Sequence, residues 1–256
     1  MLIVLSPAKS LDFDTPPVTQ RYTQPEFLAD SRLLVDRLAG FDCAQLASLM
    51  KISDALAELN VARFASWALP FSPANAKQAA LAFDGDVYEG LDAGSLDDEA
   101  LAWAQGHVRI LSGLYGVLRP LDLIQPYRLE MGTRLENERG RHLYDFWGDR
   151  IARALAGELE GSRWPVLVNL ASEEYFKAVR PKALGYPVVQ PVFQERKGAT
   201  WKVVSFQAKR ARGAMARYAI ERRIEDPEEL KRFDVDGYAF APEASDASTW
   251  IFRRAA

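Results

Sequence analysis

The most strongly charged segment of the sequence is residues 205–223, SFQAKRARGAMARYAIERR. It contains one acid, Glu221, and six bases: Lys209, Arg210, Arg212, Arg217, Arg222 and Arg223. Guanidinium and ammonium groups form charge-assisted hydrogen bonds with phosphate and carboxylate groups. A solvated helix face is the ordinary alternative, but bases without interleaved acids repel one another. We therefore expect an anionic partner for this segment.

A glycine turn forms the second candidate site, within residues 108–132, VRILSGLYGVLRPLDLIQPYRLEMG. A helix that ends near Ser112, followed by a turn containing Gly113 and Gly116, predicts a helix-hairpin-helix-like element. In such an element the glycines let backbone N–H groups approach DNA phosphates closely. A purely structural turn between helices is the alternative.

Two arginines and two tyrosines accompany this turn. Arg119 and Arg128 can pair with phosphate in bidentate fashion, or with acids of their own segment, Glu130 or Glu136. Tyr115 and Tyr127 can stack on an unpaired base, which favours distorted or partly single-stranded DNA.

Polar side chains follow two apolar runs that we expect to be buried strands, residues 2–5 (LIVL) and 166–170 (VLVNL). If the strands are parallel neighbours, Ser6, Lys9, Asn169 and Ser172 converge outside their carboxyl ends, where open α/β sheets usually bind ligands. Lys177 is expected to join them from the following helix. Alternatively, Ser172 is only a helix cap and Ser6 only part of a turn.

The sequence lacks the common enzyme signatures: phosphate loop, dinucleotide fingerprint, nucleophile elbow and zinc-protease motif. His107 and His142 have no obvious partner nucleophile. Asp84-Gly85-Asp86 resembles the start of an acidic metal loop, but the further oxygen ligands that Ca²⁺ needs do not follow. We expect no metal site, no cofactor and no catalytic residue.

The elements that position these groups are those of an α+β (mixed α/β) protein, with a mixed sheet and many helices. Helices are expected at residues 25–38, 43–50, 54–66, 75–83, 97–111, 144–159 and 205–223. Residues 188–196 and 201–206 predict a hairpin around Lys197-Gly198, and residues 238–240 with 249–252 predict another strand pair. Because no linker or repeat divides the chain, we expect one compact domain, residues 1–256.

In the predicted helix at residues 205–223, one narrow face consists mostly of small side chains. These are Ala208, Ala211, Met215, Tyr218 and Ala219, spaced by three and four residues. Such a face lets the helix lie close against the sheet. The basic residues occupy the remaining faces.

Composition limits the class of protein. The net charge is −3, but residues 84–99 carry seven acids and no base, whereas residues 196–223 carry nine bases and one acid. The acidic average therefore does not exclude a polyanionic partner. A single cysteine, Cys43, excludes an internal disulfide framework. The absence of a basic leader and of a long apolar run predicts a cytoplasmic protein with no membrane partner.

Seven stretches of the sequence resemble the YaaA family of bacterial peroxide-stress proteins. They are SPAKSLD, FDGDVYEGL, LSGLYGVLRPLDLIQPYRLEMGTRLEN, NLASEEYFK, PVF, SFQAKRARGAMARY and GYAF, in family order over nearly the whole chain. The resemblance implies a single-domain mixed α/β protein of unusual fold, with a positively charged cleft and a helix-hairpin-helix element. It also implies DNA binding and a role in limiting free intracellular iron during hydrogen peroxide stress.

The leading hypothesis is a protein that binds DNA without sequence specificity. The expected phosphate contacts are Lys9, Gly113, Tyr115, Gly116, Arg119, Arg128, Lys209, Arg210, Arg212 and Arg217. The alternative is an enzyme that acts on a phosphorylated or nucleotide substrate in the Lys9/Asn169/Ser172 cleft, with Ser6 and Lys177. A third hypothesis, iron storage, would use clustered carboxylates such as Asp84, Asp86 and Glu89. A monomer is expected.

Overall fold

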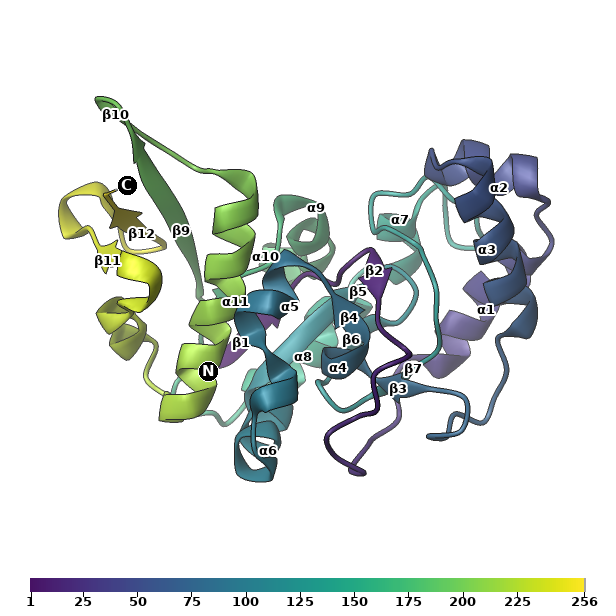
Figure 1. Cartoon of the computed structure of the whole chain (residues 1–256), viewed down its shortest axis with the longest axis horizontal. Helices are drawn as coiled ribbons and strands as arrows, with labels where there is room; N and C mark the ends of the chain where they lie inside the picture. The colour runs from purple at the N-terminus through teal and green to yellow at the C-terminus, as the bar shows by residue number, and fades with distance from the viewer. Residues whose placement is uncertain (256) are drawn as a thin grey trace.

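The computed structural model of the protein describes residues 1–255 and has an eight-stranded mixed sheet at its centre (Figure 1). Five neighbouring strands are parallel, in the order β12 (Thr249–Arg254), β9 (Val188–Lys197), β8 (Leu167–Asn169), β1 (Leu2–Leu5) and β5 (Val108–Ser112). Three strands are antiparallel to their neighbours: β11 (Ala239–Phe240) to β12, β10 (Thr200–Lys202) to β9, and β6 (Gly116–Leu118) to β5. The predicted fold class is confirmed.

The order of the parallel strands creates a switch point beside β1. After β1 the chain places β5 on one side of it and then β8 on the other, with β9 and β12 following outward. When the five parallel strands are numbered by their order along the chain, their order in space from β5 to β12 is 2-1-3-4-5. In this order the crevice outside the carboxyl ends of the first and third strands, here β1 and β8, is the usual ligand site. The prediction that residues 2–5 and 166–170 form neighbouring strands is confirmed.

Helices cover the sheet. Figure 1 shows α11 (Ser205–Arg222), α5 (Asp86–Leu91) and α6 (Asp98–His107) in front of the central strands, and α8 (Arg150–Leu159) behind them. The shorter helices are α4 (Ala79–Ala82), α7 (Leu143–Trp147), α9 (Glu173–Phe176) and α10 (Pro181–Leu184). The 3-10 helices are η1 (Ala93–Ser95), η2 (Lys177–Val179), η3 (Pro227–Arg232), η4 (Val235–Gly237) and η5 (Pro242–Ala244). Within residues 1–255, no helix is both long and apolar enough to cross a lipid bilayer.

Three helices form a lobe at the opposite end of the molecule from β11 and β12 (Figure 1). They are α1 (Leu28–Ala39), α2 (Cys43–Met50) and α3 (Asp54–Ser66), and the bounds of α2 and α3 agree with the prediction. The residues that precede α2 and α3 explain where these two helices begin. Asp42 accepts the Gln45 N–H while the Gln45 side chain accepts the Asp42 N–H, and Ser53 accepts the Leu56 N–H.

The close crossing of α11 over α5 depends on glycine. A Cβ atom on Gly213 would overlap the Val87 carbonyl oxygen, and one on Gly90 would overlap the Arg210 carbonyl oxygen. All five residues of the predicted small-residue face, Ala208, Ala211, Met215, Tyr218 and Ala219, are buried. The helix contacts α5 most extensively, through the face that carries Arg210, Gly213 and Ala214, and it also contacts β9 and β1.

Several predicted elements have different bounds. The helix expected at residues 97–111 is α6 followed by β5, and the helix expected at 144–159 is divided at Gly148, where φ is +50°. The helix expected at 75–83 is α4 between β3 (Lys77–Gln78) and β4 (Phe83–Asp84), which pair with β7 (Leu123–Ile124) and β2 (Ser10–Leu11). The strand expected at 201–206 ends at Lys202. Short apolar runs do not distinguish a buried strand from a buried helix, because both lack alternation.

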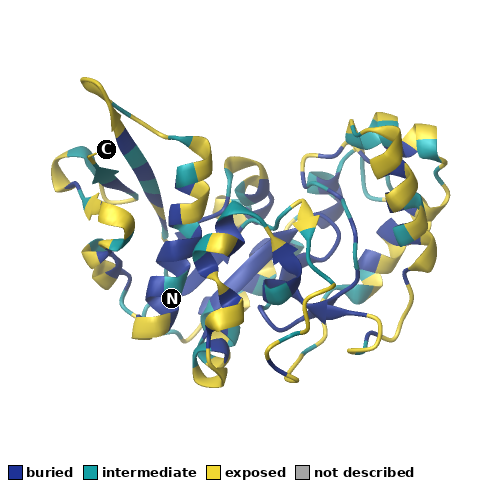
Figure 2. Ribbon diagram, in the orientation of Figure 1, coloured by how far each residue is buried: buried dark blue, intermediate teal, exposed yellow. Residues whose placement is uncertain are grey.

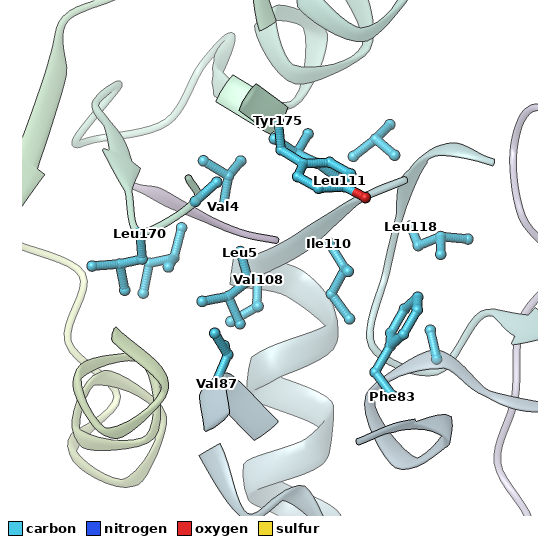
Figure 3. Close-up of a cluster of buried hydrophobic side chains, with 14 of the residues drawn as sticks. Val4, Leu5, Phe83, Val87, Val108, Ile110, Leu111, Leu118, Leu170 and Tyr175 are labelled. Carbon is cyan, nitrogen blue, oxygen red and sulfur yellow. The ribbon is translucent and has the colours of Figure 1, made fainter. Parts of the chain in front are cut away.

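The core lies between the sheet and its helices. Buried residues concentrate along the central strands in Figure 2, while the outer faces of α1–α3 and α11 carry the exposed ones. Figure 3 shows Val4 and Leu5 of β1 beside Ile110 of β5, with Val87 of α5 below them. The apolar runs that predicted the strands are therefore covered on both faces.

The crossing of α5 and α11 yields a prediction on stability. Gly213→Ala should lower the free energy of unfolding by about 2 kcal/mol or more, because the added methyl group overlaps backbone atoms that cannot rotate away. Gly157→Ala is the matched control in α8, where a Cβ meets no atom within 4 Å. It should stabilise by about 0.5 to 1 kcal/mol, because alanine favours helix. Urea denaturation of both variants checks this, and equal effects would contradict the close crossing.

Candidate functional site

A cavity of about 460 Å³ opens outside the carboxyl ends of β1 and β8, at the switch point of the sheet. It is lined by residues that follow β1, by the segment from β4 to α5, by the loop before α7, and by residues of α9 and α11. Its polar lining is Ser6, Lys9, Ser10, Asp84, Asp86, Tyr88, Glu130, Ser172, Glu174, Tyr175, Lys209 and Arg212. The structure thus brings together Ser6, Lys9 and Ser172, as expected for neighbouring parallel strands, and adds two bases of α11.

Two serines join the strand ends at the floor of the cavity. The Ser6 hydroxyl accepts the Ser172 N–H at 2.8 Å and donates to the Ser172 hydroxyl at 3.3 Å. The Tyr88 hydroxyl donates to the Ser6 carbonyl at 3.0 Å. Ser172 makes no side-chain cap on α9, so the alternative that it is only a helix cap is wrong. These hydrogen bonds hold the two hydroxyl groups side by side at the cavity.

Tyr88 and Tyr175 form an uncharged part of the cavity wall. Burial raises the pKa of both phenols, and the neighbouring Tyr127 raises them further. Both groups are therefore neutral at physiological pH and can act as hydrogen-bond donors.

The charges in the cavity are mixed. Lys9 pairs with Glu130 at 2.9 Å, and Lys209 pairs with Asp86 at 3.6 Å. Asp84 and Glu174 add two more acids, and Glu174 accepts the Gly132 N–H at 2.8 Å. The lining therefore holds three bases and four acids, and the positively charged cleft that the resemblance implies stays a prediction.

Arg212 differs from the other bases of the cavity. No hydrogen bond or ion pair within residues 1–255 involves its side chain, although the residue is half-buried. Burial lowers the pKa of its guanidinium group. An arginine in a protein nevertheless stays protonated at neutral pH, so a desolvated positive charge faces the cavity without a carboxylate.

Asn169 and Lys177 do not line this cavity. Asn169 is buried, and its side-chain oxygen accepts the Ala171 N–H at 2.9 Å, which shapes the turn after β8. The Lys177 ammonium lies over the Tyr144 ring, 4.8 Å from the ring centroid. The expectation that both converge with Ser172 on one cleft is wrong, because the turn after β8 directs them elsewhere.

The glycine turn is a β-hairpin rather than a helix-hairpin-helix. It joins β5 to β6, and Gly113, Tyr115 and Gly116 are all buried. A Cβ on Gly113 would overlap the Leu129 carbonyl oxygen, and one on Gly116, where φ is +72°, would lie 2.7 Å from the Trp147 ring. These glycines allow close approach of the chain to itself, so the prediction that they face DNA is wrong.

Both arginines after the turn pair with acids of their own segment. Arg119 contacts Asp122 at 3.0 Å, and Arg128 contacts Glu130 at 3.2 Å. Asp122 is buried, and burial raises its pKa although the Thr23 hydroxyl donates to it at 2.6 Å.

The basic helix α11 faces the acidic run of residues 84–99. Besides the Lys209–Asp86 pair, Arg217 contacts Asp92 at 3.2 Å and Arg223 contacts Glu99 at 2.5 Å. Arg217 also donates to Glu221 and to the Ser95 hydroxyl, while Arg210 lies 3.9 Å from Asp236. The anionic partner expected for the segment is therefore, in large part, the acidic run of the same chain.

A family model described as peroxide stress protein YaaA matches residues 1–244. The chain belongs to this family. A UPF0246 protein of Azoarcus sp. (strain BH72) is 61% identical over 99% of both chains. A UPF0246 protein of Ralstonia nicotianae is 60% identical over the full length of both chains, and one of Dechloromonas aromatica is 57% identical over 99% of both.

Several cavity residues of this family member were not identified from the sequence as parts of a site. Tyr88, Glu174 and Tyr175 belong to it because α5 and α9 both border the cavity. Glu174 and Tyr175 follow Ser172 directly, so the strand-end argument could have included them. Tyr88 has no such signal, because its place depends on the contact between α5 and α11.

The serine pair yields a prediction on stability. Ser6→Ala should lower the free energy of unfolding by about 1 kcal/mol, because the Ser172 N–H loses its acceptor in a partly buried position. Ser10→Ala is the control, since Ser10 is exposed in the adjoining β2 and should change stability by less than about 0.5 kcal/mol. Chemical denaturation measures both. Equal stability of the two variants would show that the serine pair does not join the strand ends.

Proposed function

We propose that this member of the peroxide stress protein family binds a small phosphate-bearing molecule in the cavity at the ends of β1 and β8. The observation that carries the proposal is Arg212, a half-buried guanidinium group that lines the cavity without a carboxylate partner. Desolvating a charge is unfavourable unless an opposite charge offsets it. A bound phosphate supplies that opposite charge in bidentate geometry.

The neighbouring groups suit the same ligand. Lys9 and Lys209 are exposed by 62% and 52% and hold one acid each, so each can turn from its acid to a ligand at small cost. The Ser172 hydroxyl supplies a neutral hydrogen-bond donor, whereas the Ser6 hydroxyl and the Tyr88 phenol already donate to Ser172 and to the Ser6 carbonyl. The volume of about 460 Å³ lies in the usual range of small-molecule sites, roughly 300 to 1,000 Å³.

The acids of the cavity favour a small ligand over a long polyanion. Asp84, Asp86, Glu130 and Glu174 surround the bases, so the field changes sign within the site. A duplex presents a continuous row of phosphates, and some of them would face these carboxylates. A molecule with one phosphate can contact the bases alone.

The proposal for the cavity is one of ligand binding and includes no catalytic step. His107 stacks on Trp103 with ring centroids 4.0 Å apart, and His142 lies 3.2 Å from Asp145, both away from the cavity lining. The enzyme alternative needs a base to activate Ser6 or Ser172, and the two serines bond to each other. In the enzyme alternative, the substrate is a phosphorylated molecule or a nucleotide.

Replacement of Arg212 tests this proposal. Wild-type protein is titrated calorimetrically with inorganic phosphate and with thymidine 5′-monophosphate, and we expect saturable binding of the nucleotide. Arg212→Gln should weaken it by roughly 10- to 100-fold, since a charge-assisted hydrogen bond contributes about 1.5 to 3 kcal/mol. Arg222→Gln is the control on the same helix, because Arg222 is exposed and outside the cavity. Absence of wild-type binding at millimolar nucleotide, or equal losses in both variants, contradicts the proposal.

Non-specific DNA binding is the second candidate, favoured by the helical hairpin α2–α3. Three residues, Lys51, Ile52 and Ser53, join the two helices, and Lys51 has φ of 54° in the left-handed region. Lys51, Ser53 and the first residues of α3 are exposed. Tight helical hairpins of this kind can present backbone N–H groups to a phosphate. This segment, rather than Gly113–Gly116, is where we place the helix-hairpin-helix.

Acidic residues near the α2–α3 hairpin make DNA the less favoured of the two ligands. Burial, together with the carboxylates of Glu58, Asp54 and Asp42, raises the pKa of the Cys43 thiol. The field at this end of α2 and α3 is therefore partly negative, which weakens attraction to a duplex.

The DNA proposal predicts that charge reversal at the hairpin lowers affinity for duplex of arbitrary sequence. Lys51→Glu should weaken binding and reduce the slope of log K against log salt by about 1, as one phosphate contact is lost. Lys182→Glu is the control, an equal charge change at an exposed lysine of α10. Fluorescence anisotropy from low to moderate salt measures both. Equal slopes for the two variants exclude the hairpin as the DNA contact.

Limitation of free iron is proposed as an indirect result of one of these two binding activities. Asp84 and Asp86 line the cavity, whereas Glu89 is outside its lining and borders two neighbouring grooves, one of which Asp84 also lines. Within residues 1–255, no group of three or more His, Cys, Asp or Glu side chains has an arrangement that could hold a metal ion.

A further inference from the structure

Arg212 has a counterpart of opposite charge among the residues that line the cavity. Of the four acids in the lining, Asp86 and Glu130 form ion pairs, and Glu174 accepts a backbone N–H. The carboxylate of the fourth, Asp84, takes part in no hydrogen bond or ion pair within residues 1–255. One guanidinium group and one carboxylate therefore remain without a partner in the same cavity.

Asp84 and Arg212 lie on different walls of the cavity. Asp84 ends β4, where it pairs through its backbone with Ser10 of β2, and Arg212 belongs to α11. Helix α5 contacts both β4 and α11, and Figure 1 shows it between them. The two unpaired groups are thus held by separate elements and form no ion pair with each other, so a ligand that neutralises both must carry both charges.

A second cavity, of about 200 Å³, adjoins the first and shares Asp84 and Tyr88 with it. The other charged residues of its lining are three acids and one base: Asp12, Glu89, Asp92 and Lys77. The space beyond Asp84 therefore has an excess of negative charge, which attracts a cation and repels a phosphate.

The base of the second cavity is already occupied. The Lys77 ammonium donates to the Asp12 and Thr15 carbonyl oxygens at 2.7 and 2.8 Å and lies 3.4 Å from the Asp12 carboxylate. Its side chain is only 7% exposed. Hydrogen bonds from Thr15 and Asp14 lower the pKa of the Asp12 carboxyl to about 2, so this group is ionised at neutral pH. An ammonium group has three hydrogens, and those of Lys77 have acceptors within the chain, so Lys77 is not available to a ligand phosphate.

We propose that the ligand of the cavity carries a protonated amine as well as a phosphate, with the phosphate at Arg212 and the amine at Asp84. The class of ligand is then a phosphorylated amine, such as an aminoalkyl phosphate or an amino sugar phosphate. A guanidinium group donates charge-assisted hydrogen bonds to a phosphate, and a carboxylate accepts them from an ammonium group. The inference rests on the proposed function, because Arg212 supplies the phosphate contact.

A ligand of this kind accounts for the mixed charge of the lining. A phosphate without an amine would leave Asp84 facing a second anion, which is unfavourable. A phosphorylated amine neutralises both unpaired groups. It also enters in one orientation, because its amine is repelled by Arg212 and its phosphate by Asp84 and the acids of the second cavity.

Two pairs of probes, each matched except for the amine, test the inference in calorimetric titrations at neutral pH. 2-Aminoethyl phosphate is compared with ethyl phosphate, and glucosamine 6-phosphate is compared with glucose 6-phosphate. Wild-type protein should bind the amine of at least one pair about tenfold more tightly than its matched phosphate. This factor is at the lower end of what a charge-assisted hydrogen bond contributes.

Asp84→Asn should change the two affinities of such a pair in opposite directions. Affinity for the amine should fall about tenfold, because its partner is lost, whereas affinity for the matched phosphate should rise, because a repelling charge is removed. Partial unfolding would lower both affinities, so the opposite signs separate loss of the contact from loss of structure. Asp234→Asn is the control, an equal charge change at an exposed residue outside the lining of both cavities, and it should change neither affinity.

The outcomes separate this inference from the proposed function. A preference for an amine that Asp84→Asn removes supports a phosphorylated amine as the ligand. Phosphate binding that needs Arg212, with no preference for either amine or with a preference that Asp84→Asn leaves intact, overturns the amine alone. Binding of thymidine 5′-monophosphate without binding of either amine has the same meaning. If neither the four probes nor the nucleotide bind, the proposed function fails as well.

Discussion

The close crossing of α5 and α11 is the constraint on which the candidate site depends. At Gly90 and Gly213 the two helices approach so closely that a methyl group on either residue would meet backbone atoms of the other helix. This approach sets the distance between the acidic run that contains α5 and the basic residues of α11. It also places Tyr88 and Asp86 of α5 opposite Lys209 and Arg212, and these four residues form one side of the cavity.

Charge pairing across this crossing explains how a chain of net charge −3 accommodates a helix with so many bases. Asp86 and Asp92 contact bases of α11, and Glu99 contacts Arg223, which follows the helix. Such exposed pairs contribute little to stability one by one, but together they neutralise most of the repulsion along the helix. Arg212 lines the cavity together with Asp84 and Asp86, but it forms no ion pair with either carboxylate, so its charge stays unpaired. The ligand proposal follows from this exception, whereas most of the basic helix serves the fold.

The glycine turn between β5 and β6 belongs to a second structural network, which ties the helical lobe to the sheet. The Trp147 indole donates to the Gly113 carbonyl at 2.9 Å, and the Trp67 indole, at the end of α3, donates to the Tyr115 hydroxyl at 3.2 Å. Tyr115 and Tyr127 pack edge to face with centroids 5.2 Å apart. This network holds the end of α3 against the β5–β6 turn.

The sequence by itself determined the local elements with strong signals. The apolar runs of β1 and β8, the bounds of α2 and α3 and the small-residue face of α11 depend on neighbouring residues along the chain, and all were predicted. The strand-end argument also brought Ser6, Lys9 and Ser172 together, because the carboxyl ends of parallel neighbours meet at one edge of a sheet. Tertiary structure alone decided which charges are neutralised. Asp86, Glu130 and Arg128 reach their partners or remain without them through contacts between segments far apart in the sequence. The distinction between a backbone N–H that donates to its own chain, as at Tyr115, and one that donates to a ligand likewise depends on burial, which spacing along a sequence does not encode.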